Sequence, residues 1–124
     1  MDLTDLTITK INQGLKNKEF SSTEITKAYL EQIKKKDEAI GAYLSVTEQL
    51  ATTQAENADK IILRHGSGDF PVLTGVPCAI KDVILVEGQK CTAASKILEN
   101  YEAPYDATVI TKLKEKGAVI LGKT

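Results

Sequence analysis

A lysine and an aspartate stand side by side within an apolar run in the second half of the chain. The run spans residues 78–86, and only Lys81 and Asp82 interrupt it. In one interpretation Lys81 is buried, and burial favours the neutral amine, which then accepts protons as a general base. In the other interpretation Lys81 is structural, and its ammonium reaches outward at an edge to pair with Asp82 or another acid. The residue types alone leave both interpretations open.

The last eight residues match a phosphate-binding pattern. Residues 117–124 read Gly-Ala-Val-Ile-Leu-Gly-Lys-Thr, which fits G-x-x-x-x-G-K-T. A phosphate loop lies between a strand and the N-terminus of a helix, with its backbone N–H groups turned towards the anion. Here a predicted helix comes first, and the apolar residues 118–121 favour an extended strand. We therefore predict a buried strand at this place and no nucleotide site.

Cysteine and histidine are too few to indicate a metal centre. Cys78 and Cys91 are the two cysteines, and His65 is the single histidine. The cysteine spacing is neither that of a redox pair nor that of a zinc knuckle. We expect two reduced thiols packed as small apolar groups, and we expect no metal ligands.

Composition and charge are typical of a globular protein. The 124 residues are 42% hydrophobic and 27% charged, and their formal net charge is −1. This composition argues against disorder, and the charge provides no general attraction to nucleic acid or to an anionic membrane. No apolar run approaches the ~20 residues that cross a bilayer, and the first residues lack the pattern of a secretory signal. A cytoplasmic location is predicted.

The first half of the chain predicts helices that would lie under any site in the second half. Thr7 is an N-cap residue for a short helix. Ser21 opens a capping box for a longer helix, which we expect to end in the lysines of residues 34–36. A third helix follows a short extended stretch at residues 43–46 and ends at Gly66.

The second half predicts the start of an α/β sheet. The apolar run 78–86 is expected to be a strand, Asp106 to cap a helix that Gly117 closes, and residues 118–121 to form a second strand. A strand, a helix and a strand in this order imply a crossover connection. So short a sheet leaves an apolar edge. We therefore expect an incomplete chain that is aggregation-prone, dimeric or only partly ordered from about residue 67 onward.

Three stretches of the second half resemble the amidase signature family. Residues 75–82, Gly-Val-Pro-Cys-Ala-Ile-Lys-Asp, mark the family as a whole. Residues 95–109 and 117–124 resemble more narrowly one branch of it, the A subunits of tRNA-dependent amidotransferases. The N-terminal helices fit the same branch, so the resemblance covers nearly the whole chain. The sequence departs from the family pattern at Val83, where asparagine is commoner, and in residues 91–94.

The resemblance implies that Lys81 is the catalytic base of a Ser–cis-Ser–Lys triad. In the family the bridging serine and the nucleophilic serine lie beyond the position of Thr124, so the chain alone is expected to be inactive. The complete protein would release ammonia from the side-chain amide of glutamine by nucleophilic acyl transfer. Ser95 has no nucleophilic role in this pattern.

The resemblance also implies a fold, a set of partners and a place for the cofactors. The implied fold is α/β, with N-terminal helices followed by the first strands and a crossover helix of a mixed sheet, an incomplete amidase-signature fold. Residues 1–124 would be the N-terminal fragment of one amidase domain, helical over 1–66 and starting the α/β core over 67–124. Two other subunits would complete a heterotrimer. One of them would use ATP and magnesium on misacylated Glu-tRNA(Gln) or Asp-tRNA(Asn), and would bind most of the tRNA. No cofactor is expected in this chain.

Two other functions remain open at this point. A stand-alone amidase acting on other amides would share the family stretch, and only residues 95–109 argue against it. A non-catalytic interaction module with a structural lysine would explain the length of the chain, but it would leave residues 75–82 unexplained.

Overall fold

The computed structural model describes residues 2–66 and 68–124, so the predicted boundary residue Ser67 lies outside the described residues. Four α-helices and three strands follow one another along the described chain. They are α1 (Ile8–Asn17), α2 (Ser22–Ile40), β1 (Ser45–Val46), α3 (Glu48–His65), β2 (Pro77–Ile80), α4 (Thr108–Glu115) and β3 (Val119–Lys123). Short 3-10 turns at Leu3–Asp5 and Lys96–Leu98 complete the regular structure. Among the described helices, none is both long and apolar enough to cross a membrane.

The N-caps of the first two helices are those that the sequence predicts. The hydroxyl of Thr7 accepts a hydrogen bond from Lys10 N at 3.3 Å. Ser21 and Glu24 form both bonds of a capping box, at 3.1 and 2.7 Å. Each cap satisfies backbone N–H groups that have no partner within the helix.

The predicted end of α2 in the lysines of residues 34–36 is wrong. The helix continues to Ile40, because lysine, glutamate and alanine are all good helix formers. It ends at Gly41, which adopts a left-handed conformation with φ +66° and donates its N–H to Asp37 O. A residue without a Cβ takes this conformation at little cost.

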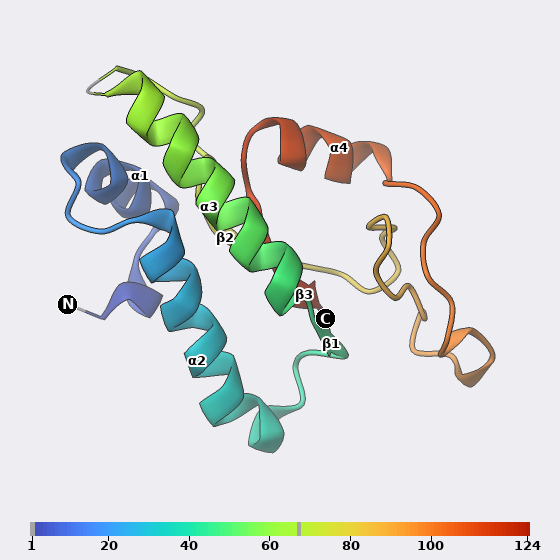
Figure 1. Ribbon diagram of the computed structural model, residues 1–124. Helices are drawn as coiled ribbons and strands as arrows, with labels where there is room; N and C mark the ends of the chain where they lie inside the picture. The colour runs from blue at the N-terminus through green and yellow to red at the C-terminus, as the bar shows by residue number, and fades with distance from the viewer. Residues whose placement is uncertain (1, 67) are drawn as a thin grey trace.

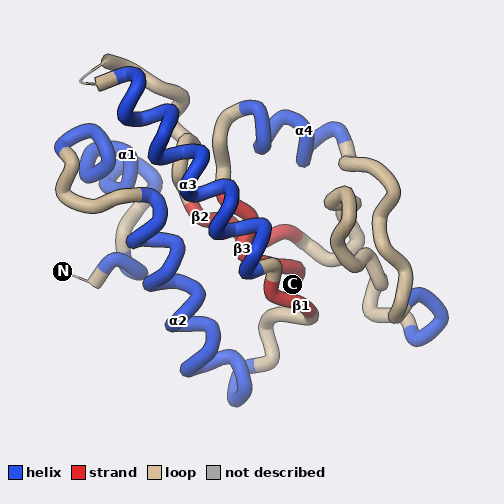
Figure 2. The backbone as a smooth tube through the Cα atoms, viewed as in Figure 1, coloured by secondary structure: helices blue, strands red, loops and turns tan. Residues whose placement is uncertain are grey.

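The sheet is mixed, and β3 is its central strand (Figure 2). β3 pairs antiparallel with β1 and parallel with β2, and α4 lies in the connection between the two parallel strands. All five residues of β3 are buried. The predicted α/β class, the crossover helix and the buried strand at residues 118–121 are therefore confirmed.

Two details of the second half differ from the prediction. The strand predicted over residues 78–86 ends at Ile80, and a turn follows in which Ile84 N donates to Lys81 O at 2.9 Å. Asp106 does not cap α4, because its carboxylate instead accepts bonds from Glu87 N and from Lys114, both at 2.7 Å. The Asp106 carboxylate is therefore satisfied by a backbone N–H and an ammonium group, and Ala107 takes the N-cap position of α4 without a side-chain cap bond.

Helices cover both faces of the sheet. α2 and α3 lie side by side in Figure 1, and their apolar side chains meet one face. The buried cluster on this face consists of Leu30, Ala51, Ala55, Val119 and Leu121. α4 lies on the other face, where the buried cluster consists of Ile80, Val86, Ile110 and Ile120. Alternate residues of β3 thus contribute to different clusters, as the two-residue period of a strand requires.

Gly122 allows β1 to approach the end of β3. A Cβ at this position would lie 2.5 Å from Ser45 O and 2.8 Å from the ring of Tyr43. The glycine of the final Gly-Lys-Thr is therefore a packing residue where β1 pairs with β3. The side chain of its neighbour Lys123 is buried.

Candidate active site

Lys81 occupies an exposed position just after β2. Its side chain is exposed, and its Nζ donates one hydrogen bond of 3.4 Å, to Thr124 O. The expected burial of this lysine in an apolar strand is wrong for the described chain, because the strand ends one residue earlier. The alternative interpretation, in which the Lys81 ammonium reaches outward, agrees with this exposure. The expected pairing of Lys81 with Asp82 is absent from the described residues, because Asp82 pairs with a different lysine.

The buried lysine of this region is Lys123, at the end of β3. Its side chain has no exposed surface. Its Nζ donates to Asp82 O at 3.0 Å and to Lys90 O at 2.9 Å, and it lies 3.7 Å from Asp82 Oδ1. An ammonium group has three donors, and here two carbonyl oxygens and one carboxylate surround it.

Asp82 is the acidic partner in this buried cluster and is 2% exposed. Its Oδ2 accepts the hydroxyl of Thr92 at 2.7 Å and Thr92 N at 3.1 Å. Burial by itself would raise the pKa of the Asp82 carboxyl. The Thr92 hydroxyl and the charge of Lys123 outweigh burial, so the pKa lies below its ordinary value. Asp82 therefore keeps its negative charge next to the Lys123 ammonium.

The segment that faces Asp82 holds an unusual backbone conformation. Ala93 and Ala94 have φ values of +48° and +55°, which are left-handed conformations that side chains disfavour. Two contacts accompany them: Ala94 N donates to the Thr92 hydroxyl at 3.2 Å, and Cys91 Sγ donates to Asp82 O at 3.2 Å. Such strain persists where surrounding contacts determine the conformation.

The described residues bring no serine of a catalytic triad to Lys81. Ser95 precedes the 3-10 turn Lys96–Leu98 without a side-chain cap bond. Ser22 is buried and donates to Gly75 O at 3.1 Å, which is a packing role.

Both cysteines are free thiols, as predicted. Among the described residues, no three His, Cys, Asp or Glu side chains gather as metal ligands.

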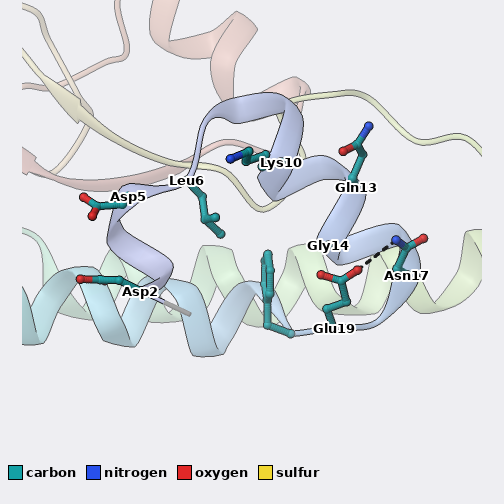
Figure 3. A pocket seen from close by; sticks show the side chains of 9 residues that line it. Asp2, Asp5, Leu6, Lys10, Gln13, Gly14, Asn17 and Glu19 are labelled. Atoms are coloured by element: carbon teal, nitrogen blue, oxygen red, sulfur yellow. Dashed lines mark hydrogen bonds between the residues drawn. The ribbon is translucent and has the colours of Figure 1, made fainter.

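An open hollow lies on the N-terminal side of the molecule, between the first 3-10 turn and α1 (Figure 3). It has a volume of about 450 Å³, and charged side chains including Asp2, Lys10 and Glu19 line it. Asn17 donates to Glu19 at 3.1 Å across one end of it. None of its lining residues comes from the segment around Lys81, so it is separate from the candidate site.

The profile of the family described as Amidase matches residues 24–124. This match covers most of the chain and includes Lys81, Asp82, Thr92 and Lys123. The chain therefore belongs to the amidase family.

Individual relatives resemble the chain over nearly its whole length. Two of them are A subunits of glutamyl-tRNA(Gln) amidotransferase. The one from Geobacter metallireducens is 48% identical over 99% of the chain, which covers 25% of that relative. The one from Ruminiclostridium cellulolyticum is 48% identical over all 124 residues, again 25% of its length. Among solved structures, the peptide amidase from Stenotrophomonas maltophilia superposes with a TM-score of 0.86 at 28% identity, over 97% of this chain and 24% of the amidase. The chain thus spans about a quarter of the length of these proteins.

Sequence reasoning missed Lys123 as a residue of the site. The sequence contained the signal, because Lys123 continues an apolar run of the type buried on both faces of a sheet. The phosphate-binding pattern that contains Lys123 was rejected as a nucleotide site, and no other role was predicted for this lysine. A lysine buried in an apolar strand, which was expected at position 81, is found at position 123.

Proposed function

We propose that this chain is the N-terminal part of the glutaminase subunit of a tRNA-dependent amidotransferase, and that it contributes the lysine of that subunit's catalytic triad. The observation that carries the proposal is the 48% identity to the Geobacter metallireducens relative over 99% of the chain. Lys81 stands in the stretch 75–82 that marks the family. It is also the exposed lysine of the site, so hydroxyl groups from outside the described residues have access to its Nζ.

In the proposed reaction the amine of Lys81 accepts a proton from a bridging serine, which in turn deprotonates a nucleophilic serine. The serine oxygen attacks the amide carbon of the glutamine side chain, Lys81 returns its proton through the bridging serine to the departing nitrogen as the C–N bond breaks, and ammonia leaves. Water then hydrolyses the acyl-enzyme, which releases glutamate and restores the serine. A general base of this kind contributes roughly a hundredfold to ten-thousandfold to the rate.

The ammonia would serve a second reaction in a partner subunit. There ATP and magnesium would activate the carboxylate of glutamate or aspartate that is misacylated onto tRNA, and ammonia would convert it to the amide. Two partner subunits in a heterotrimer, with the tRNA bound mainly by the partner, belong to this proposal. The cytoplasm is the proposed location, because charged tRNA and ATP meet there.

The test is ammonia release from glutamine by the full-length protein, purified alone and together with its two partner subunits. We expect glutaminase activity from the full-length protein and none from residues 1–124. We also expect the partner subunits to co-purify and the complex to form amidated tRNA only with ATP present. A full-length protein that associates with its partners but releases no ammonia from glutamine contradicts the proposal.

A stand-alone amidase is the second candidate, and the similarity to the peptide amidase from Stenotrophomonas maltophilia favours it. The two candidates differ in substrate and in partners. A stand-alone amidase would hydrolyse peptide or aryl amides faster than glutamine and would need no other protein chain. A full-length protein that is monomeric and prefers such amides would establish this second function instead.

A further inference from the structure

We infer that Lys123 and Asp82 form a buried clamp that positions Lys81 for proton transfer. This inference rests on the proposed function, because it assigns a role to residues around the proposed base. Lys123 and Asp82 act through the backbone that carries Lys81, so they are positioning residues. Among the described residues, neither side chain is hydrogen-bonded to the Lys81 amine.

Lys81 is held in place by its backbone more than by its side chain. Its exposed side chain has one hydrogen bond, of 3.4 Å, so little packing constrains it. Its backbone is held on both sides. Thr124 N donates to Ile80 O at 2.9 Å, and Asp82 N donates to Thr124 O at 2.8 Å. The position of the Lys81 amine therefore depends on the residues just before and just after it.

Lys123 joins both ends of the segment that follows Lys81. One bond from its Nζ goes to the carbonyl of Asp82, beside Lys81, and another goes to the carbonyl of Lys90. The Asp82 carboxylate makes a parallel connection through Oδ2 to the backbone N–H and the hydroxyl of Thr92. Two buried side chains thus close the segment from residue 82 to residue 92 into a loop of defined shape.

The clamp consists of two charged side chains, Lys123 and Asp82. Taking a lysine and an aspartate out of water is costly, and an apolar pair of similar volume often stabilises a protein as well or better. A clamp made of charges is therefore poorly explained by stability alone. Charged hydrogen bonds are directional, so they specify the geometry of the segment, including the left-handed conformations of Ala93 and Ala94. A proton acceptor that must meet a serine hydroxyl at hydrogen-bond distance needs such a defined position.

The central experiment uses the double variant Asp82→Asn/Lys123→Met of the full-length protein in its complex. Removing both charges avoids leaving one of them buried without a partner. We expect kcat for glutamine hydrolysis to fall by about tenfold or more, with KM within about twofold of the wild type, because the proton transfer is lost and not the binding of substrate. The matched control is Lys112→Met, which removes an exposed lysine on α4 that makes no side-chain hydrogen bond within the described residues. A folded double variant with wild-type kcat overturns the inference.

A milder pair of variants keeps the inference testable if the double variant does not fold. Thr92→Val removes the hydroxyl that Asp82 accepts and keeps the side-chain volume, whereas Thr92→Ser keeps the hydroxyl. We expect Thr92→Val to lower kcat by about threefold to tenfold at constant KM, and Thr92→Ser to recover most of that loss. Equal turnover in the two Thr92 variants overturns the inference, because a hydroxyl that only fills space would make no such difference.

Lys81→Ala, measured alongside, separates this inference from the proposed function. Wild-type turnover in Lys81→Ala removes the proposed catalytic role and with it any need for a clamp. An inactive Lys81→Ala next to a fully active, folded Asp82→Asn/Lys123→Met removes the clamp alone.

Discussion

Asp82 and Asp106 illustrate, at the scale of single residues, how this protein keeps carboxylates charged in enclosed places. Asp82 is buried and Asp106 is partly buried, and burial by itself would raise the pKa of each. Asp82 has the Thr92 hydroxyl and Lys123 beside it, and Asp106 has Lys114 and the backbone N–H of Glu87. These partners outweigh burial, and both pKa values lie below the ordinary value of 3.8.

These lowered pKa values predict that acid destabilises the protein in a defined pH range. A carboxyl with a lower pKa in the folded state binds fewer protons there than in the unfolded state. Its contribution is therefore complete above the ordinary value of 3.8 and is lost as the pH falls through the folded-state pKa. We expect the free energy of unfolding, measured with urea, to fall as the pH is lowered from about 5 to about 2.5.

The variant Asp106→Asn tests the assignment of this effect. It removes the ion pair with Lys114, so the free energy of unfolding should depend less steeply on pH in this range than in the wild type. Glu115→Gln is the control, because Glu115 is exposed and makes no side-chain hydrogen bond within the described residues. If the free energy of unfolding depends equally on pH in the wild type and in Asp106→Asn, the ion pair between Asp106 and Lys114 contributes nothing to the loss of stability in acid.

Cys78 provides a second prediction at the residue scale. Burial raises the pKa of its thiol to about 11. At about pH 8 the thiolate is then roughly a hundredfold scarcer than in an ordinary cysteine, and the thiolate is the reactive form. We expect iodoacetamide to modify Cys78 in the native protein roughly a hundredfold more slowly than in urea, as followed by mass spectrometry. Modification at comparable rates in both conditions contradicts the burial of this thiol.

At the scale of elements, β3 determines how the two halves of the molecule meet. β1 from the helical half and β2 from the second half pair with opposite sides of it. From α3, Gln54 accepts a hydrogen bond from Ile120 N at 2.8 Å. Thr47, which precedes α3, donates its hydroxyl to Ile120 O at 2.9 Å. The register of this single strand therefore sets where both β1 and the Lys123 ammonium lie.

The variant Gly122→Ala is expected to disturb this register. The new Cβ would lie within 3 Å of Ser45 O and of the Tyr43 ring, so β1 has to move away. We predict a loss of about 2–4 kcal/mol in the free energy of unfolding, measured with urea. Gly41→Ala is the matched control. No atom lies within 4 Å of its new Cβ, and only the left-handed backbone costs about 1 kcal/mol. Equal losses in the two variants would contradict the close approach of β1.

The sequence predicted the elements better than their ends. Helical periodicity and the caps at Thr7 and Ser21 identified α1 and α2, since local side-chain contacts determine a helix start. α2 ends at the first glycine that can adopt a left-handed conformation, which is Gly41. The three lysines of residues 34–36 do not end a helix, because lysine is a good helix former. The strand at residues 78–86 was predicted too long, because the partners of Asp82 are Thr92 and Lys123, which are distant in sequence.

At the scale of the whole molecule, the sheet is open at both sides within the described residues. β1 and β2 each have β3 as their single neighbour. Several apolar side chains of the second half are also exposed, and Ile97 is the most exposed of them at 94%. The others in this half include Val83, Tyr101, Tyr105 and Val109. Exposed strand edges and apolar surface favour association with another chain.

This arrangement predicts that residues 1–124, expressed alone, self-associate. We expect sedimentation velocity to show dimers or larger species whose share grows with protein concentration. The variant Ile97→Lys should shift the distribution towards the monomer, because it places a charge in the apolar surface. A monomer at every concentration, with one sharp thermal transition, contradicts the prediction.

The candidate site was predictable only in part. The stretch 75–82 led to Lys81 and to the amidase family, because a short contiguous motif can be recognised without knowledge of the fold. The clamp was not found, because Asp82, Thr92 and Lys123 meet only after the crossover helix brings β3 beside β2. Whether a lysine is buried depends on such contacts between elements that are distant in sequence. Apolar neighbours along the chain do not determine whether it is buried.

Glutamine turnover by the full-length complex with Lys81→Ala tests directly whether Lys81 is the proton acceptor. We expect kcat to fall by about a thousandfold, within the range of a general base, while the melting temperature stays at the wild-type value. Lys112→Ala, an exposed lysine outside the site, should keep wild-type turnover in the same assay. A folded Lys81→Ala complex that releases ammonia as fast as the wild type would contradict the role of Lys81 as the proton acceptor.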